Sequence, residues 1–213
     1  SSAASDVYKR QGPYADTIPN LAFAAFQMMF AMITPALITG SVAGRMKFKA
    51  LVLFIILWSL IVYYPMAHMV WGEGGFLAEI GSVDFAGGNV VHITSGVSGL
   101  VLALTLGKRR GYDQGVYHVH NTPFVFLGAA LLWFGWYGFN GAAATSTDSL
   151  ASIFLTTTLA PALATVSCMV FTWLKDGKPD VGMCLNASLA GLVAVTAGCA
   201  SVDAVGAIII GIV

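Results

Sequence analysis

Long uninterrupted apolar segments dominate the chain. They do not alternate polar and apolar residues as a half-buried strand does, and most hold about the 20 residues that a helix needs to cross a bilayer core of about 30 Å. The pattern predicts seven helical spans, near residues 20–44, 50–71, 88–106, 122–143, 150–174, 181–199 and 204–213, the last of which is cut off at Val213.

Composition agrees with this pattern and indicates the fold class. Hydrophobic residues make up 57% of the 213 positions and charged residues only 9%, against about 25% charged residues in an average soluble domain. Continuous runs argue against a transmembrane barrel, whose strands alternate over about 10 residues. We therefore predict an all-α, polytopic membrane helical bundle over residues 13–213. Residues 1–12 lack apolar periodicity and are interpreted as a non-native or disordered tail, with a short native extracellular stretch as the alternative.

Lysine and arginine occur in every second loop. The basic residues that follow the first, third and fifth spans are Arg45, Lys47, Lys49, Lys108, Arg109, Arg110, Lys175 and Lys178. The loops between these contain acidic residues but no Lys or Arg. Cytoplasmic loops of membrane proteins are enriched in Lys and Arg. The loops predicted to be cytoplasmic are therefore 45–49, 107–121 and 175–180.

One histidine lies inside an apolar, glycine-rich segment, GGNVVHITSGVSGL (87–100). His92 stands one helical turn before Ser95, which opens a repeat of small residues with Gly99 and Ala103. Such a repeat lets neighbouring helices approach closely, so we expect His92 to face the bundle and not the lipid. A ring in this position either makes an interhelical hydrogen bond or lines a polar path, and ionisable residues within spans are functional candidates.

The other histidines and the cysteines indicate no separate chemistry. His68 follows Pro65, where a kink frees carbonyl groups that the ring can bond, and His118 and His120 lie in a cytoplasmic loop, where their spacing is weak evidence for a metal. The cysteines, expected to be small buried hydrophobes without CxxC spacing, are Cys168, Cys184 and Cys199. The spans hold no nucleophile with a base and no cluster of metal ligands, so we predict no enzyme, metal or cofactor.

Four stretches together resemble the ammonium transporter (Amt) family. They are FQMMF (26–30), AHMVWGEGG (67–75), DFAGGNVVHITSGVSGL (84–100) and GWYGFNGAAA (135–144), and they follow the family's order along the chain. The resemblance implies an inverted-repeat fold of eleven helices, a homotrimer with one pore in each subunit, and ammonium or ammonia as the substrate. This chain would then be a fragment that covers the third to ninth helices.

The resemblance also implies roles for the aromatic residues and His92. At the outer mouth, Trp71 would hold an ammonium ion by a cation–π contact, with Phe26 and Phe30 as aromatic neighbours. Phe30 and Phe139 would form a stacked gate beneath this site. His92 would be the first of two pore histidines, the second of which belongs to a later helix beyond Val213.

Three further positions complete the implied site. Asp84 would lie below the ion without touching it and would shape the local field and fold, and Asn140, beside the gate, would be structural. Ala143 stands where the family usually has a serine, so a hydroxyl that helps to bind ammonium is missing. Thr145 and Ser146 are the candidates to replace it.

The physical chemistry of ammonium transport suits these residues. Ammonium matches potassium in charge and size, so selectivity must use its N–H donors and its removable proton. An aromatic cage favours a cation by about 0.5–2 kcal/mol, whereas stripping water from an ion costs far more. Deprotonation to ammonia removes most of this barrier, and imidazoles such as His92 can bind ammonia and pass on the proton.

Two alternatives differ from transport. An ammonium sensor would keep the fold and carry an attached signalling domain, which the sequence beyond Val213 would reveal. A seven-helix receptor or retinal protein fits less well, because no span holds a lysine at bilayer depth for a Schiff base and the 24 glycines indicate close helix packing. The expected partners are ammonium and a lipid bilayer, for which the plasma membrane is the simplest choice. No nucleic-acid partner is expected.

Overall fold

The computed structural model describes residues 11–12, 15–114, 120–144 and 146–213. Most of the predicted tail, together with His118 and Thr145, lies outside the described residues. The last two tail residues form β1 (Gln11–Gly12), which pairs with β2 (Ala15–Pro19) in a small antiparallel ladder. This ladder is a local addition that the all-α prediction did not include.

Helices occupy the predicted apolar stretches. The long ones are α2 (Asn20–Val42), the continuous run α3 (Phe48–Trp58), η1 (Ser59–Tyr63) and α4 (Tyr64–Trp71), the run η2 (Gly88–Ile93) and α6 (Thr94–Leu106), then α7 (Thr122–Gly141), α8 (Leu150–Asp176), α9 (Val181–Thr196) and α10 (Ala204–Ile212). Two short helices, α5 (Phe76–Glu79) and η3 (Tyr112–Gln114), lie in loops. Five stretches of the described chain are long and apolar enough to cross a membrane. The predicted fold class is confirmed.

The chain forms two compact units, and each combines two separate stretches of sequence. One unit contains residues 1–67 and 93–110, and the other contains residues 68–92 and 111–213. The site residues other than Phe26 and Phe30 belong to the second unit.

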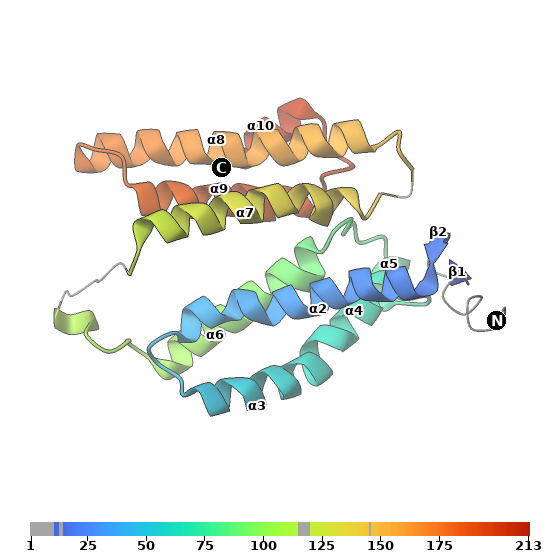
Figure 1. Ribbon diagram of the computed structural model, residues 1–213, viewed down its shortest axis with the longest axis horizontal. Helices are drawn as coiled ribbons and strands as arrows, with labels where there is room; N and C mark the ends of the chain where they lie inside the picture. Colours follow the sequence, from blue (N-terminus) through green and yellow to red (C-terminus); the bar gives the residue numbers. More distant parts are fainter. Residues whose placement is uncertain (1–10, 13–14, 115–119, 145) are drawn as a thin grey trace. The chain divides into compact units, whose positions relative to one another are not determined.

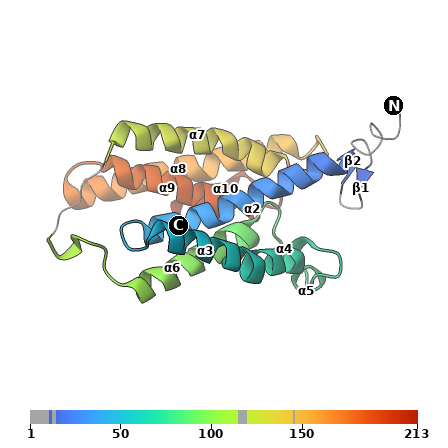
Figure 2. The same cartoon turned by 60° about the horizontal axis from the view of Figure 1, so that its bottom comes forward.

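In the first unit, α2 packs along α6 (Figures 1 and 2). Gly99 of α6 lies so close to Ser41 that an added Cβ would come within 2.6 Å of the serine hydroxyl oxygen. The expected role of the small-residue repeat is confirmed at this position. Arg45 then holds the end of α6, because its Nη1 donates to the carbonyls of Ala103 at 3.1 Å and Gly107 at 2.8 Å, where the helix dipole favours a cation.

In the second unit, α8 packs against α9 and α10, while α7 packs against α8 and α9 (Figure 1). Small residues permit this contact, since an added Cβ at Gly191 would lie 2.7 Å from the Cα of Pro161. The buried core of this unit consists of Ile153, Ala160, Val195, Cys199 and Ala207. Cys199 is therefore buried as expected, whereas Cys168 and Cys184, which lie away from this core, are only half-buried.

Short polar signals begin and end the helices of the second unit. The side chains of Asn121, Asp180 and Asp203 each accept a backbone N–H at the start of a helix, as N-cap residues do. Gly177, with φ of 76°, ends α8 in the left-handed conformation, which glycine adopts without steric cost.

Within each unit, loops predicted to be cytoplasmic lie close to one another. In the first unit, the Arg45 hydrogen bonds bring the loop after α2 to the end of α6. In the second, Thr122 at the start of α7 lines a groove together with Pro179 of the α8–α9 loop. The side of the membrane that these ends face stays a prediction.

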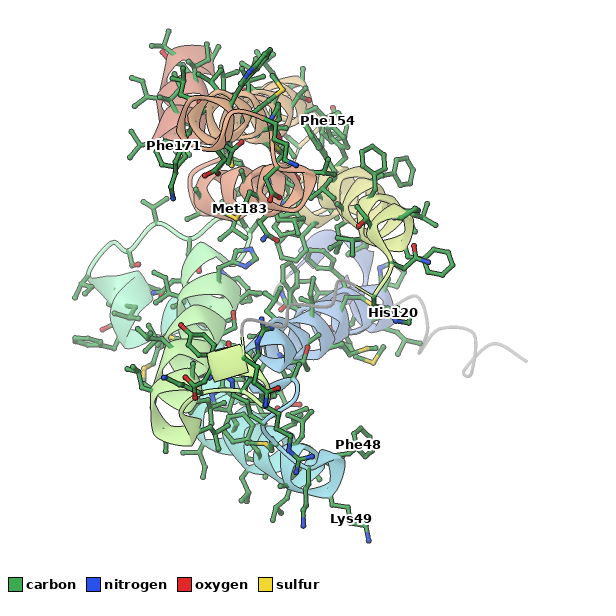
Figure 3. All side chains as sticks on the ribbon, turned by 90° about the vertical axis from the view of Figure 1, so that its left-hand side faces the viewer. Phe48, Lys49, His120, Phe154, Phe171 and Met183 are labelled. Atoms are coloured by element: carbon green, nitrogen blue, oxygen red, sulfur yellow. The ribbon has the colours of Figure 1, made fainter. Side chains whose placement is uncertain are left out.

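Many large apolar side chains are exposed, including Leu104, Phe134 and Leu174. Phe48 extends outward beside Lys49 at the start of α3 and is 77% exposed (Figure 3). Apolar exposure on this scale suits helices that are surrounded by lipid or by further helices.

The π-helical turn η1 accommodates Pro65. The N–H of Tyr64 bonds the carbonyl of Ser59, five residues back, and this wider turn relieves the clash that a proline ring makes with the preceding helical turn. The described structure shows no hydrogen bond from the His68 ring to a freed carbonyl, and this side chain is exposed. The backbone adjusts by rebonding within η1 without using the histidine.

Candidate functional site

Asp84 organises the chain that leads to His92. Its Oδ1 accepts the N–H of Gly87 at 2.8 Å, and its Oδ2 accepts the N–H groups of Asn89 at 2.9 Å and Val90 at 3.0 Å. The carboxylate is 8% exposed and caps the start of η2, where backbone N–H groups would otherwise lack acceptors. The carboxylate thus stabilises the turn before η2, while its effect on the local field stays a prediction.

Trp71 lies beside this cap. Its Nε1 donates to the backbone carbonyl of Asp84 at 2.9 Å, and an added Cβ at Gly87 would lie 3.5 Å from the far edge of the indole. Gly87 has φ of 104°, a conformation that residues with a side chain rarely adopt. The turn at Gly87 therefore places the indole of Trp71 over the start of η2.

His92 lies on the π-helical turn that Asp84 caps. The N–H of His92 bonds the carbonyl of Gly87 at 3.1 Å, five residues back. The imidazole is 7% exposed and stacks on Trp136, with centroids 5.4 Å apart and planes at 14°, and on Phe139, at 5.9 Å and 29°. The prediction that His92 faces the protein interior is confirmed.

Asn140 and Ala143 follow Phe139 along α7 and the turn after it. Asn140 is fully buried, and its Nδ2 donates to the hydroxyl of Thr157 on α8 at 2.9 Å. The N–H of Ala143 bonds the carbonyl of Asn140 at 3.3 Å, and Ser146, one candidate for the missing hydroxyl, is exposed. The contacts of Asn140 suit a structural role.

Phe26 and Phe30 lie on α2 in the first unit. Their rings meet edge to face, with centroids 4.9 Å apart and planes at 86°, and Phe30 is 3% exposed. Edge-to-face pairs are a favoured arrangement of aromatic rings. Their position around Trp71 and the stack of Phe30 on Phe139 would join the two units, and both stay predictions.

Trp136 and Thr196 belong to this site, although neither was predicted. Trp136 is buried against His92 and Phe139, and its Nε1 donates to the hydroxyl of Thr196 at 2.9 Å. One signal was available for Trp136: it stands three residues before Phe139, so both lie on one face of α7. No local pattern marks Thr196, which is 60 residues away along the chain.

The chain is similar to a known family over nearly all of its residues. The pattern of the family described as "Ammonium Transporter Family" matches residues 5–213. An ammonium transporter of Mycobacterium tuberculosis is 48% identical over 209 residues, which cover 94% of this chain and 44% of that protein. The chain therefore spans less than half the length of this relative.

Solved structures show the same similarity in three dimensions. Mep2 of Saccharomyces cerevisiae superposes with a TM-score of 0.86 at 38% identity, over 93% of this chain and 46% of that one. A structure titled "Sensor Amt Protein" superposes with a TM-score of 0.83 at 31% identity, over 97% of this chain and 58% of that one. Because the family pattern matches nearly the whole of this chain, the chain belongs to the ammonium transporter family.

Proposed function

We propose that the complete protein carries ammonium across a membrane, and that His92 accepts and passes on its proton. The observation that carries this proposal is the buried stack of His92 on Trp136 and Phe139. Aromatic walls hold the imidazole in one orientation and offer a permeating ion no compensating carboxylate. Deprotonation of ammonium is then favoured, because neutral ammonia crosses apolar surroundings at a far lower free-energy cost than the ion.

Recruitment takes place at the outer end, at Trp71. The bond from its Nε1 to the Asp84 carbonyl fixes the plane of the indole, and a fixed aromatic face is what a cation–π contact requires. Phe26 and Phe30 complete the aromatic cage, and Phe30 with Phe139 forms the gate below it. Asp84 acts indirectly, because its carboxylate is used in three backbone hydrogen bonds that hold the turn leading to His92.

The proposal extends to the assembly and its orientation. The complete protein is a homotrimer in the plasma membrane, with a pore in each subunit, and loops 45–49, 107–121 and 175–180 face the cytoplasm. Exposed apolar residues such as Leu104 and Phe134 supply the surface that lipid or neighbouring subunits cover.

Side-by-side measurement of ammonium and potassium flux in the complete protein tests the role of His92. We expect His92→Ala to abolish ammonium flux while ammonium still binds at Trp71. His92→Glu should admit potassium, because a carboxylate at this depth holds a cation without requiring deprotonation. His120→Ala is the matched control, since this exposed histidine lies in a loop (Figure 3). Normal rate and selectivity in a well-assembled His92→Ala protein would contradict the proposal.

Ammonium sensing is the second candidate, supported by the similarity to the structure titled "Sensor Amt Protein". A sensor would bind ammonium at Trp71 and transmit the signal to an attached domain. Binding without measurable flux in the complete wild-type protein would favour sensing over transport, and Trp71→Ala should remove the binding in either case.

A further inference from the structure

The hydroxyl of Thr196 holds the indole of Trp136 in one orientation. Thr196 is fully buried at the end of α9. Its Oγ1 donates to the carbonyl of Leu192 at 2.6 Å and accepts the Nε1–H of Trp136 at 2.9 Å. Because the hydroxyl donates its one proton to the Leu192 carbonyl, its oxygen lone pairs point toward the indole and accept the N–H of Trp136.

Ala197, the residue that follows α9, holds the backbone that leads to His92. The carbonyl of Ala197 accepts the N–H of Phe85 at 3.0 Å. Gly88, the first residue of η2, lies against Ala197 so closely that an added Cβ would be 3.0 Å from the Ala197 nitrogen. Two successive residues, the last of α9 and the one that follows it, thus fix both the turn that carries His92 and the ring on which His92 stacks.

The two contacts determine the geometry of the imidazole together. Ala197 sets the position of η2, and Thr196 sets the rotation of Trp136, whose ring is nearly parallel to that of His92. A tryptophan side chain has two rotatable bonds, so one hydrogen bond at Nε1 combined with the stack leaves its plane little freedom. A proton-transfer group has to be held within about 0.5 Å and 10–20° of its productive geometry.

We propose that Thr196 is a positioning residue for His92, acting through the Trp136 indole. This inference rests on the proposed transport function and adds a residue that does not itself meet the substrate. Valine matches the shape of threonine without its hydroxyl, whereas serine retains the hydroxyl. The isosteric pair Thr196→Val and Thr196→Ser therefore separates hydrogen bonding from packing.

The experiment measures ammonium flux and the ¹⁹F NMR spectrum of the complete protein labelled with 5-fluorotryptophan. The Trp136 resonance is assigned by its loss in Trp136→Phe. We expect Thr196→Val to lower the flux about fivefold, the factor that corresponds to one neutral hydrogen bond, and to shift or broaden the Trp136 resonance. Thr196→Ser should restore both. Thr156→Val is the matched control, because Thr156 is equally buried and bonds the Cys199 carbonyl instead of an indole, and it should leave the Trp136 resonance unchanged.

Two results would overturn the proposal: an unchanged Trp136 resonance in Thr196→Val, whatever its flux, or the same loss in Thr196→Ser as in Thr196→Val. If Thr196→Val fails to assemble, Trp136→Phe removes the same hydrogen bond from its other side, and wild-type flux in that protein would also overturn it. The fluorine measurement does not depend on transport. A wild-type protein without ammonium flux but with the expected fluorine pattern would therefore refute the proposed function and leave the positioning of Trp136 intact.

Discussion

Two π-helical turns interrupt the spans, and they differ in origin and surroundings. Pro65 lies two residues after the end of η1. Two side chains of this turn are largely exposed, Leu60 at 60% and Ile61 at 70%. In η2, no proline is present, and Val90, Val91 and His92 are buried. The first turn relieves a steric clash, whereas the second is held by side chains and backbone from outside the helix.

The comparison indicates that the wider turn alone does not mark a functional site. Both turns shift backbone hydrogen bonds by one residue, and each buries an aromatic or imidazole ring, Tyr63 in η1 and His92 in η2. The turn η2 in addition has a buried carboxylate at its start and a glycine packed against the residue that follows α9. We therefore use contacts from outside the helix to separate the turn assigned to ammonium transport, η2, from the turn that only accommodates a proline, η1. Changes around η2 should therefore have large effects, and changes at η1 small ones.

Replacing Asp84 should have the largest effect. Asp84→Ala leaves the N–H groups of Gly87, Asn89 and Val90 without their acceptor. A hydrogen bond to a charged group contributes about 1.5–3 kcal/mol, so we expect the complete protein to lose more than about 3 kcal/mol of stability and to assemble poorly. Yield and thermal stability of the purified protein measure this loss.

Asp84→Asn sharpens the same comparison. The amide retains one acceptor oxygen but turns its NH₂ toward either Gly87 or the Asn89–Val90 pair, so the stability should fall between those of the wild type and Asp84→Ala. Equal stability of all three proteins would show that the cap does not hold η2.

Gly88→Ala should have an intermediate effect. The new methyl group would meet Ala197 and force η2 away from α9, and such overpacking costs about 1–3 kcal/mol. We expect lower thermal stability and lower ammonium flux. Gly96→Ala is the matched control: this helical glycine has no neighbour within 4 Å in the described structure, and alanine there should stabilise the helix by up to about 1 kcal/mol.

Removing the neighbour's methyl group tests the cause. In the double variant Gly88→Ala with Ala197→Gly, the space for the new methyl is restored, and we expect most of the loss to be recovered. A double variant as impaired as Gly88→Ala alone would mean that the contact with Ala197 is not the reason.

The sequence predicts the helices far better than it predicts these contacts. Continuous apolar runs determine where helices form, and GGNVVH correctly indicated a buried His92. Hydrophobic periodicity, however, does not report a one-residue shift in backbone hydrogen bonding, so neither η1 nor η2 was predicted. The Trp136–Thr196 bond joins α7 and α9 across 60 residues, and only the packing of the helices brings its two atoms together.

Replacing Pro65 should have the smallest effect and completes the comparison. Pro65→Ala supplies the missing N–H and removes the ring, so the run from α3 to α4 can become a regular α-helix. Alanine is favoured over proline within a helix by about 3 kcal/mol in isolated peptides. Tyr63 is the one buried residue of η1, so the substitution should disturb few packed side chains. We expect equal or higher thermal stability. Because η1 holds none of the proposed site residues, the ammonium flux should stay within about twofold of the wild type, the factor that corresponds to about 0.5 kcal/mol. Helical content by circular dichroism, thermal unfolding and flux are the measurements. A strong loss of flux in a stable Pro65→Ala protein would show that η1 is also part of the transport machinery, and external contacts would then no longer separate the functional turn from the structural one.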